Sequence, residues 1–227
     1  MHSSDRSSGL VLDTVTIRLD GVPLLEIDCR ILPGEVLTIM GESGSGKSSL
    51  LDFIAGFLRP DFTAEGRVIL NGRDLTSRSA QDRHIGLMFQ SPLLFPHMSV
   101  LQNLMFALPA TCKRRQDRQD LAERALADVG LAGFGSRDPA TLSGGQQTRV
   151  ALMRTLLAEP EALLLDEPFS SLDRTRREEV RQLVFDLARK KGLPVLLVSH
   201  DEEDARAADG EVHRLGNGEA GNGCRTE

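Results

Sequence analysis

The stretch GESGSGKS at residues 41–48 most constrains how this chain can fold. An extended apolar run over 35–40 precedes it, and a helical pattern over 47–58 follows it. The apolar face of that helical pattern consists of Leu50, Leu51, Ile54, Ala55 and Leu58. Glycines let a backbone curl so that its N–H groups face an anion, and a lysine and a serine at the helix start can meet phosphate and Mg²⁺. The pattern predicts a phosphate-binding loop, and its flanks disfavour the alternative of a flexible Gly/Ser loop.

Further extended apolar runs recur along the chain, and helical patterns separate several of them. The runs cover residues 10–19, 66–72, 85–90, 161–167 and 194–200. Within the last two, the segments 163–165 and 195–198 are continuously apolar, as in parallel strands covered on both faces. Helical patterns over 117–129 and 173–191 alternate with them. This alternation predicts an α/β fold with a mainly parallel sheet, in which ligands gather at the carboxyl ends of the strands.

Composition limits the classes of protein that remain. With 227 residues, of which 40% are hydrophobic, the chain can form one domain, or one domain with a subdomain. A net charge of −6 argues against nucleic-acid binding by bulk electrostatics, and we interpret the basic patch at 112–118 as a solvated surface. Cysteines occur only at Cys29, Cys112 and Cys224, a spacing that favours neither a zinc site nor a disulfide framework and suggests a reducing compartment.

Both ends of the chain are polar, and no segment is long and apolar enough to span a membrane. We expect a disordered N-terminal tail at 1–9 and a flexible C-terminal tail at 216–227. No apolar run approaches the roughly 18 residues that a membrane span requires. The sequence therefore predicts a cytosolic chain whose membrane role, if any, comes through a partner.

Polar residues follow three of the predicted core strands. Asp166 and Glu167 end one strand, and because side chains alternate along a strand we expect one to face Mg²⁺ and the other an attacking water. A structural pair of acids is the alternative. His200 ends another strand, although a lone histidine is more often a surface or packing residue. Gln90 could contact both metal and water, but taken alone it indicates nothing.

A second helix start with anion-binding character lies at TLSGGQQTR, residues 141–149. Ser143, Gly144 and Gly145 can present a hydroxyl and backbone N–H groups to a phosphate. The phosphate loop already surrounds the β and γ groups on one side. The simplest arrangement is therefore a head-to-tail pair of chains, in which each nucleotide is closed over by the partner's Ser-Gly-Gly turn.

Taken together, these motifs resemble those of ATP-binding cassette (ABC) ATPases, the nucleotide-binding subunits of ABC transporters. The resemblance rests on residues 41–48, Gln90, LSGGQ (142–146), LLLDEP (163–168), SSLD (170–173) and SHD (199–201). It covers about residues 10–215 and implies a single domain with the ABC ATPase fold. That fold is a P-loop NTPase with a mainly parallel core sheet, an antiparallel β edge and a helical subdomain, here at about 91–158.

The resemblance also implies ATP and Mg²⁺ as cofactors and a role for each matching residue. Glu167, His200 and Gln90 would be catalytic, and Ser48, Gln90 and Asp166 would hold the metal. Asp173 would lie at the dimer seam. The remaining nucleotide-binding residues would be Gly41, Glu42, Ser43, Gly44, Ser45, Gly46, Lys47, Ser49, Ser143, Gly144, Gly145 and Gln146.

As to function, the resemblance implies an ATP-hydrolysing subunit that energises solute import through a partner permease. The stretch 89–108 is similar to the corresponding part of importer ATPases for thiamine, ferric iron, sulfate or polyamines. Permease subunits would dock near Leu93–Asn103, with an apolar dock whose members could instead be core residues of the helical subdomain. The dock comprises Leu93, Leu94, Phe95 and Met98. A solute-binding protein would complete the complex, nucleic acid would not bind, and the chain would lie peripherally on the cytoplasmic face of the inner or plasma membrane.

Other functions are less consistent with the sequence. An exporter ATPase is the nearest alternative, followed by a soluble ABC protein of DNA repair or translation. Repair proteins need a long coiled-coil insertion, whereas only about fifty residues separate Gln90 from Leu142, and translation factors carry two cassettes. The presence of Lys47, Asp166, Glu167 and His200 disfavours a non-catalytic scaffold.

The chain departs from the family pattern in two places. The chain has no Tyr or Trp, and the position where the family stacks adenine on an aromatic ring falls near Arg18. A guanidinium can stack on a purine, so we expect binding to persist with weaker base selectivity. The sequence also ends soon after residue 215, so we do not expect regulation through the extra C-terminal domain of many importer ATPases.

Overall fold

The computed structural model describes residues 8–215, apart from the side chains of 174–176. The chain divides into two compact units. The first contains the described residues up to Leu87, with 161–167 and the chain from Leu187 onward, and the second contains 88–160 and 168–186. Residues 1–7 of the expected N-terminal tail, the whole expected tail at 216–227 and Cys224 lie outside the described residues.

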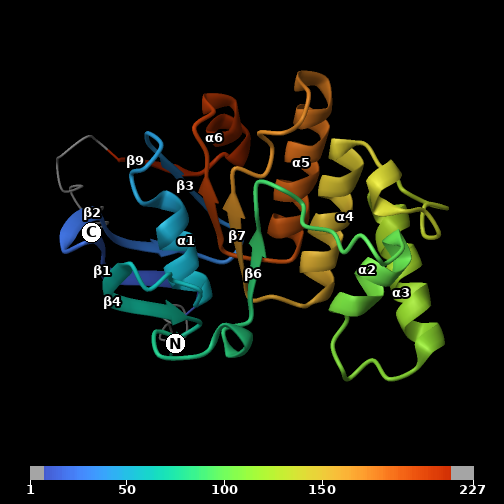
Figure 1. Cartoon of the computed structure of the whole chain (residues 1–227), viewed down its shortest axis with the longest axis horizontal. Coiled ribbons are helices and arrows are strands. Elements are labelled where there is room, and N and C mark those ends of the chain that lie inside the picture. Colours follow the sequence, from blue (N-terminus) through green and yellow to red (C-terminus); the bar gives the residue numbers. More distant parts are fainter. Residues whose placement is uncertain (1–7, 216–227) are drawn as a thin grey trace, which may run out of the picture. The chain divides into compact units, whose positions relative to one another are not determined.

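A five-stranded sheet forms the centre of the first unit (Figure 1). Its order is β6 (Ile85–Met88), β7 (Ala162–Asp166), β8 (Val195–Val198), β3 (Val36–Met40) and β9 (Glu211–Arg214). β3 pairs in parallel with β8 and β9, and β7 pairs in parallel with β8. All residues of β3 and β8 are buried, as the continuous apolar run of β8 predicts for a strand covered on both faces.

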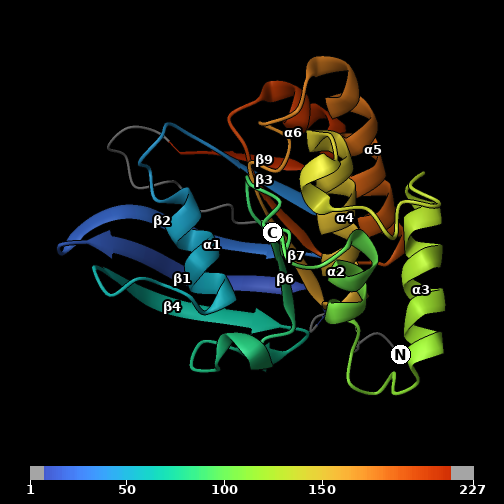
Figure 2. The same cartoon turned by 45° about the vertical axis from the view of Figure 1, so that its right-hand side comes forward.

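An antiparallel sheet completes the β structure of the first unit (Figure 2). Its order is β2 (Val22–Ile31), β1 (Leu10–Leu19), β4 (Phe62–Leu70) and β5 (Arg73–Asp74). Alternate residues of β1 and β2 are buried and pack in one cluster with Leu50, Leu51 and Ile54 of helix α1 (Lys47–Ala55). The expected α/β class, with a mainly parallel sheet and an antiparallel β edge, is confirmed.

Helix α1 is shorter than the apolar pattern over 47–58 predicts, because it ends at Gly56. Gly56 has φ +86°, and a Cβ there would lie 2.8 Å from Nε of Arg83. A left-handed glycine is a common helix terminus. The buried guanidinium of Arg83 donates to the carbonyls of Phe53 and Ile54, each at 2.8 Å, and so satisfies the end of the helix.

The second unit is mainly helical. Its helices are α2 (Val100–Ala107), α3 (Arg115–Asp128), α4 (Gly144–Leu157) and the part of α5 (Arg174–Lys190) up to Asp186, with a 3₁₀ turn at Pro139–Thr141. Figures 1 and 2 both show α2 beside α3 and α4, and residue contacts join these helices. A short helix, α6 (Glu202–Ala208), and a 3₁₀ turn at Ala80–Asp82 belong to the first unit. Within residues 8–215, no helix combines the length and apolar character needed to cross a membrane.

Candidate functional site

The phosphate loop joins the end of β3 to the start of α1, as the sequence predicts. The Ser45 N–H and hydroxyl both meet the carbonyl of Glu42, at 3.3 and 2.9 Å, which closes the loop into a turn. Gly46 has φ +85°, and a Cβ there would approach the Leu24 side chain of β2 to 3.3 Å. Because the left-handed conformation and the close neighbour both favour glycine, local sequence and tertiary packing agree on the path of the loop.

Lys47 is 7% exposed, and its ammonium group lies over this loop. It donates to the carbonyls of Gly41 (2.9 Å) and Glu42 (2.5 Å) and to Oγ of Ser45 (3.2 Å). Burial lowers the pKa of Lys47, and the carboxylates of Glu167 and Asp166 oppose that effect. The ammonium is thus held beside the loop in the field of two acids, where a phosphate would meet it.

Ser48 and Asp166 come together although 118 residues separate them in sequence. The Ser48 hydroxyl donates to Oδ1 of Asp166 at 3.3 Å. Burial raises the pKa of Asp166, the hydrogen bond from Ser48 opposes this, and the charges of Glu167 and Asp52 raise it further. A hydroxyl and a carboxylate beside a phosphate loop suit Mg²⁺, which usually takes one or two carboxylates and completes its shell with phosphate oxygens and water.

Glu167 points to a different neighbour, His200. Its carboxylate Oε1 lies 3.2 Å from Nδ1 of His200, whose side chain is 64% exposed. The backbone of Glu167 is in the left-handed region, with φ +44°, which is uncommon for a residue with a side chain. Its N–H donates to the carbonyl of Val198 at 2.9 Å, so this conformation is tied to the end of β8. The two adjacent acids thus have different partners: Asp166 contacts Ser48, and Glu167 contacts His200.

The Ser-Gly-Gly turn lies in the second unit and starts helix α4. Ser143 and Gln146 form a capping box, in which the Ser143 hydroxyl accepts from the Gln146 N–H at 3.4 Å and the Gln146 side chain accepts from the Ser143 N–H at 3.0 Å. A Cβ at Gly144 would lie 3.6 Å from the Leu172 side chain. The turn and the segment before Asp173 are therefore neighbours, which sequence separation alone did not indicate.

Two further predicted site residues are Gln90 and Arg18. Gln90 is exposed and lies in the second unit, beyond the end of β6 at Met88. Arg18 lies on β1, and its guanidinium is 3.8 Å from the carboxylate of Glu65 on β4. Its expected contact with adenine stays a prediction.

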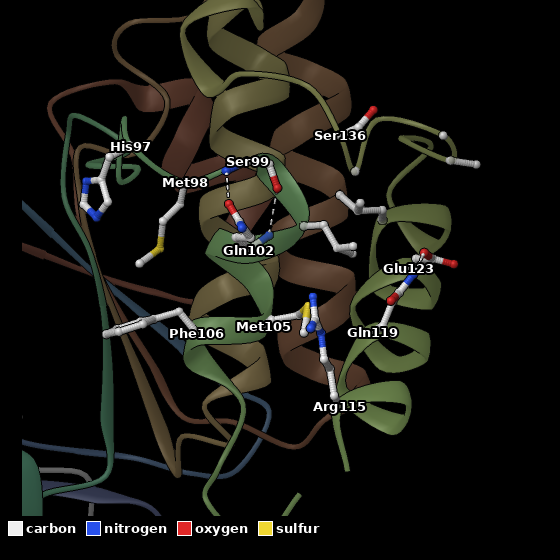
Figure 3. A pocket seen from close by; sticks show the side chains of 15 residues that line it. His97, Met98, Ser99, Gln102, Met105, Phe106, Arg115, Gln119, Glu123 and Ser136 are labelled. Carbon is white, nitrogen blue, oxygen red and sulfur yellow. Dashed lines mark hydrogen bonds between the residues drawn. The ribbon is translucent and has the colours of Figure 1, made fainter. Parts of the chain in front are cut away.

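A groove with a volume of about 1150 Å³ opens on the second unit, between α2, α3 and the loop at 132–136 (Figure 3). Its apolar lining includes Met98, Leu101, Met105 and Leu126, and its polar lining includes Gln102 and Glu123. Phe106, which is 62% exposed, also lines it. The sequence pattern does not predict this groove, because the groove depends on how two helices and a loop pack.

The loop that leads into α2 is held by two side chains. Asn103 is fully buried and bonds to both the N–H (2.9 Å) and the carbonyl (3.1 Å) of Phe95. Arg154 of α4 donates to the carbonyls of Pro92 (3.2 Å) and Leu93 (3.0 Å). Leu93 is 57% exposed and has φ +45°, so an apolar side chain is presented outward from a fixed, left-handed backbone. Leu94, Phe95 and Met98 are half-buried.

Comparison with known proteins gives consistent results. The sequence profile described as ABC transporter matches residues 24–170. An uncharacterized ABC transporter ATP-binding protein of Escherichia coli K12, YnjD, is 45% identical over 199 residues, which are 87% of this chain and 91% of that protein. The Fe(3+) ions import ATP-binding protein FbpC 1 of Rhizobium meliloti is 41% identical over 187 residues, which are 82% of this chain and 52% of that protein. The chain thus spans about half the length of this iron-import relative.

Proposed function

Since the chain belongs to the ABC transporter family, we propose that it binds and hydrolyses ATP and thereby energises solute import through a partner permease. One observation carries the catalytic part of this proposal. Five polar side chains of one unit lie where β3, β7 and β8 end, namely those of Lys47, Ser48, Asp166, Glu167 and His200. The carboxyl edge of a parallel sheet is where α/β proteins bind their ligands.

ATP would bind with its phosphates against the N–H groups of the phosphate loop and the start of α1. Lys47, already aligned by the carbonyls of Gly41 and Glu42, would turn its charge toward the β- and γ-phosphates. Ser48 and Asp166 would hold Mg²⁺, which neutralises phosphate charge. Within residues 8–215 no cluster of three or more His, Cys, Asp and Glu side chains could hold a metal by itself, so the phosphates would complete the coordination.

Glu167 would accept the proton of the attacking water at its carboxylate. His200 contributes by position: with Nδ1 beside Oε1 of Glu167, it orients that carboxylate and leaves Nε2 available to a γ-phosphate oxygen. We also propose that Gln90 contacts the γ-phosphate and Mg²⁺ and relays the nucleotide state to the permease.

The second half of each nucleotide site would come from another copy of the chain. The capping box at Ser143 occupies the N–H of Gln146 and fixes the first turn of α4, so the N–H groups of Gly144 and Gly145 would be the ones that face an anion. Leu172 packs beside Gly144, which keeps Asp173 near that turn. These contacts support the head-to-tail dimer with two ATP molecules.

Permease docking is proposed for the second unit, near Leu93–Asn103. The exposed Leu93 and the apolar lining of the groove beside α2 provide a surface for a cytoplasmic segment of the permease. A solute-binding protein and a peripheral position on the cytoplasmic face of the membrane complete the proposal. Ferric-ion import is the activity in the names of several relatives, and import is the direction we propose here.

Phosphate release by the purified chain tests the catalytic proposal. We expect Mg²⁺-dependent hydrolysis that Glu167→Gln reduces by about 100-fold or more while nucleotide still binds, because a general base contributes about 10²–10⁴-fold. Lys47→Ala should weaken binding itself. Glu202→Gln, an exposed change in an ion pair with Arg214, is the matched control and should hydrolyse like the wild type. Equal rates for Glu167→Gln and wild type would refute the role of Glu167.

A further inference from the structure

Ser199 lies between the last residue of β8 and His200, and its hydroxyl is buried. The Ser199 Oγ donates to Oδ2 of Asp204 at 2.5 Å and accepts from the N–H of Asp201 at 3.1 Å. Ser199 is 1% exposed and Asp204 is 3% exposed. A carboxylate is rarely buried unless it is hydrogen-bonded, and a bond from a hydroxyl to an ionised carboxylate is stronger than one between neutral groups. This contact therefore fixes the turn that follows β8.

The backbone on either side of Ser199 is fixed to two other strands. The N–H of Ser199 donates to the carbonyl of Ile39 on β3 at 3.2 Å. The carbonyl of Val198 accepts the N–H of Glu167 at 2.9 Å. The backbone of Glu167 is therefore bonded to Val198, the residue before Ser199. The carboxylate of Glu167 contacts the side chain of His200, the residue after Ser199. The direction in which the chain turns at Ser199 decides whether His200 reaches Glu167.

We infer that Ser199 and Asp204 are positioning residues, whose buried hydrogen bond holds His200 against the carboxylate of Glu167. The inference rests on the proposed function, in which Glu167 receives the proton of the attacking water. Stabilising the start of α6 does not by itself account for this bond, because that helix has other attachments. Asp201 caps it by accepting from the Glu203 N–H at 2.8 Å, and Glu202 pairs with Arg214 at 2.7 Å.

Steady-state ATP hydrolysis by Ser199→Ala, Ser199→Thr and wild-type protein tests the inference. Ser199→Ala should lower kcat about tenfold while KM and the Kd for ATP change less than about twofold, since the phosphate loop is untouched. Ser199→Thr keeps the hydroxyl and should restore most of kcat. Glu202→Gln also alters α6 but not the bond to Ser199, so it should match the wild type.

A double-variant cycle separates positioning from a general structural effect. If Ser199 acts through His200, then Ser199→Ala should cause no further loss of kcat in a His200→Ala background. Asp204→Asn, which keeps the volume but replaces one carboxylate oxygen with an amide nitrogen, should lower kcat about threefold and likewise have no effect in that background. If Ser199→Ala does not fold, the Asp204→Asn variant tests the same positioning role.

Three results would overturn the inference: folded Ser199→Ala with wild-type kcat, a loss of ATP affinity as large as the loss of kcat, or an undiminished effect of either substitution in the His200→Ala background. In each case the wild type still hydrolyses ATP, so the proposed function stands. A wild-type protein that binds no nucleotide and releases no phosphate would instead refute the proposed function.

Discussion

Arg83 shows how a single buried charge organises the helix that carries the phosphate loop. Its guanidinium reaches four carbonyls, those of Phe53 and Ile54 at the end of α1 and those of Thr76 and Arg78. All four would lose a charge-assisted donor if the side chain were truncated. Because buried acceptors without donors are costly, the position of α1 depends on this residue.

We predict that Arg83→Ala lowers the free energy of unfolding by about 3 kcal/mol, since it removes several charge-assisted bonds at a buried site. Arg78→Ala is the matched control: its side chain is exposed, and the change should stay within about 0.5 kcal/mol. Urea denaturation followed by circular dichroism measures both. A loss in Arg83→Ala no larger than in the control would contradict this account.

Glu161, at the start of β7, gives the fold a dependence on pH. Burial raises the pKa of Glu161, but hydrogen bonds from Asn71 and Arg73 and the charge of Arg73 outweigh burial, so that the pKa is lower than that of an ordinary glutamate. A lowered carboxyl pKa stabilises the folded state above the unfolded pKa of about 4.3, and this contribution is lost as the pH falls.

We therefore predict that stability falls less steeply below pH about 4.3 in Glu161→Gln than in the wild type. Above that pH the variant should be the less stable of the two. Urea denaturation at several pH values compares the slopes. If the free energy of unfolding depends on pH in the same way in wild type and Glu161→Gln, then the contacts of Glu161 with Asn71 and Arg73 do not stabilise the fold.

The loop at 92–98 is ordered by side chains rather than by regular structure. Asn103 forms hydrogen bonds with the backbone N–H and carbonyl of Phe95. Arg154 donates to the carbonyls of Pro92 and Leu93, and its Cζ lies over the Phe95 ring, 5.2 Å from the ring centroid. The planar fork of arginine suits two neighbouring carbonyls, which a lysine cannot bridge in the same way.

Arg154→Lys should therefore release this loop while leaving α4 intact. We expect amide hydrogen exchange over 92–98 to speed up about tenfold, an effect equivalent to about 1.4 kcal/mol of lost local stability. Arg149→Lys is the same substitution on the same helix, but Arg149 contacts Val129 and Glu179 instead. Exchange over 92–98 that is equally fast in both variants would show that Arg154 does not hold the loop.

The sequence predicts the elements best where one signal dominates. The run over 10–19 coincides with β1, and the run over 35–40 becomes β3. The prediction of α1 is too long because the pattern of apolar residues continues past Gly56, where the backbone turns left-handed. We did not predict β2, although Leu25, Ile27, Cys29 and Ile31 alternate as a half-buried strand requires. Nor did we predict α2, whose capping box at Ser99 and Gln102 was a readable signal.

For the candidate site, residue types and spacing predict which side chains take part but not which of them are in contact. Ser48 contacts Asp166, and Glu167 contacts His200. The residues of each pair are far apart in the sequence, and the pairing of β3, β7 and β8 brings them together. The sequence does not predict the hydrogen bond between Ser199 and Asp204, because it depends on how the chain turns after β8. These contacts are determined by tertiary packing and not by the motifs.

We predict a fixed stoichiometry of chains and ATP molecules. Phosphate-loop residues and Glu167 lie in one unit, whereas the Ser-Gly-Gly turn lies in the other. If the turn of one copy closes over the nucleotide of another, two chains should enclose two ATP molecules, and a variant that binds but does not hydrolyse ATP should accumulate in that state.

Light scattering of Glu167→Gln protein after size exclusion, with and without ATP and Mg²⁺, measures this stoichiometry. We expect the mass of one chain without nucleotide and, with ATP, twice that mass and two bound nucleotides. Adding Lys47→Ala to the same protein should prevent the change by weakening ATP binding. A Glu167→Gln protein that binds ATP at saturation and yet keeps the mass of one chain would contradict the shared nucleotide site.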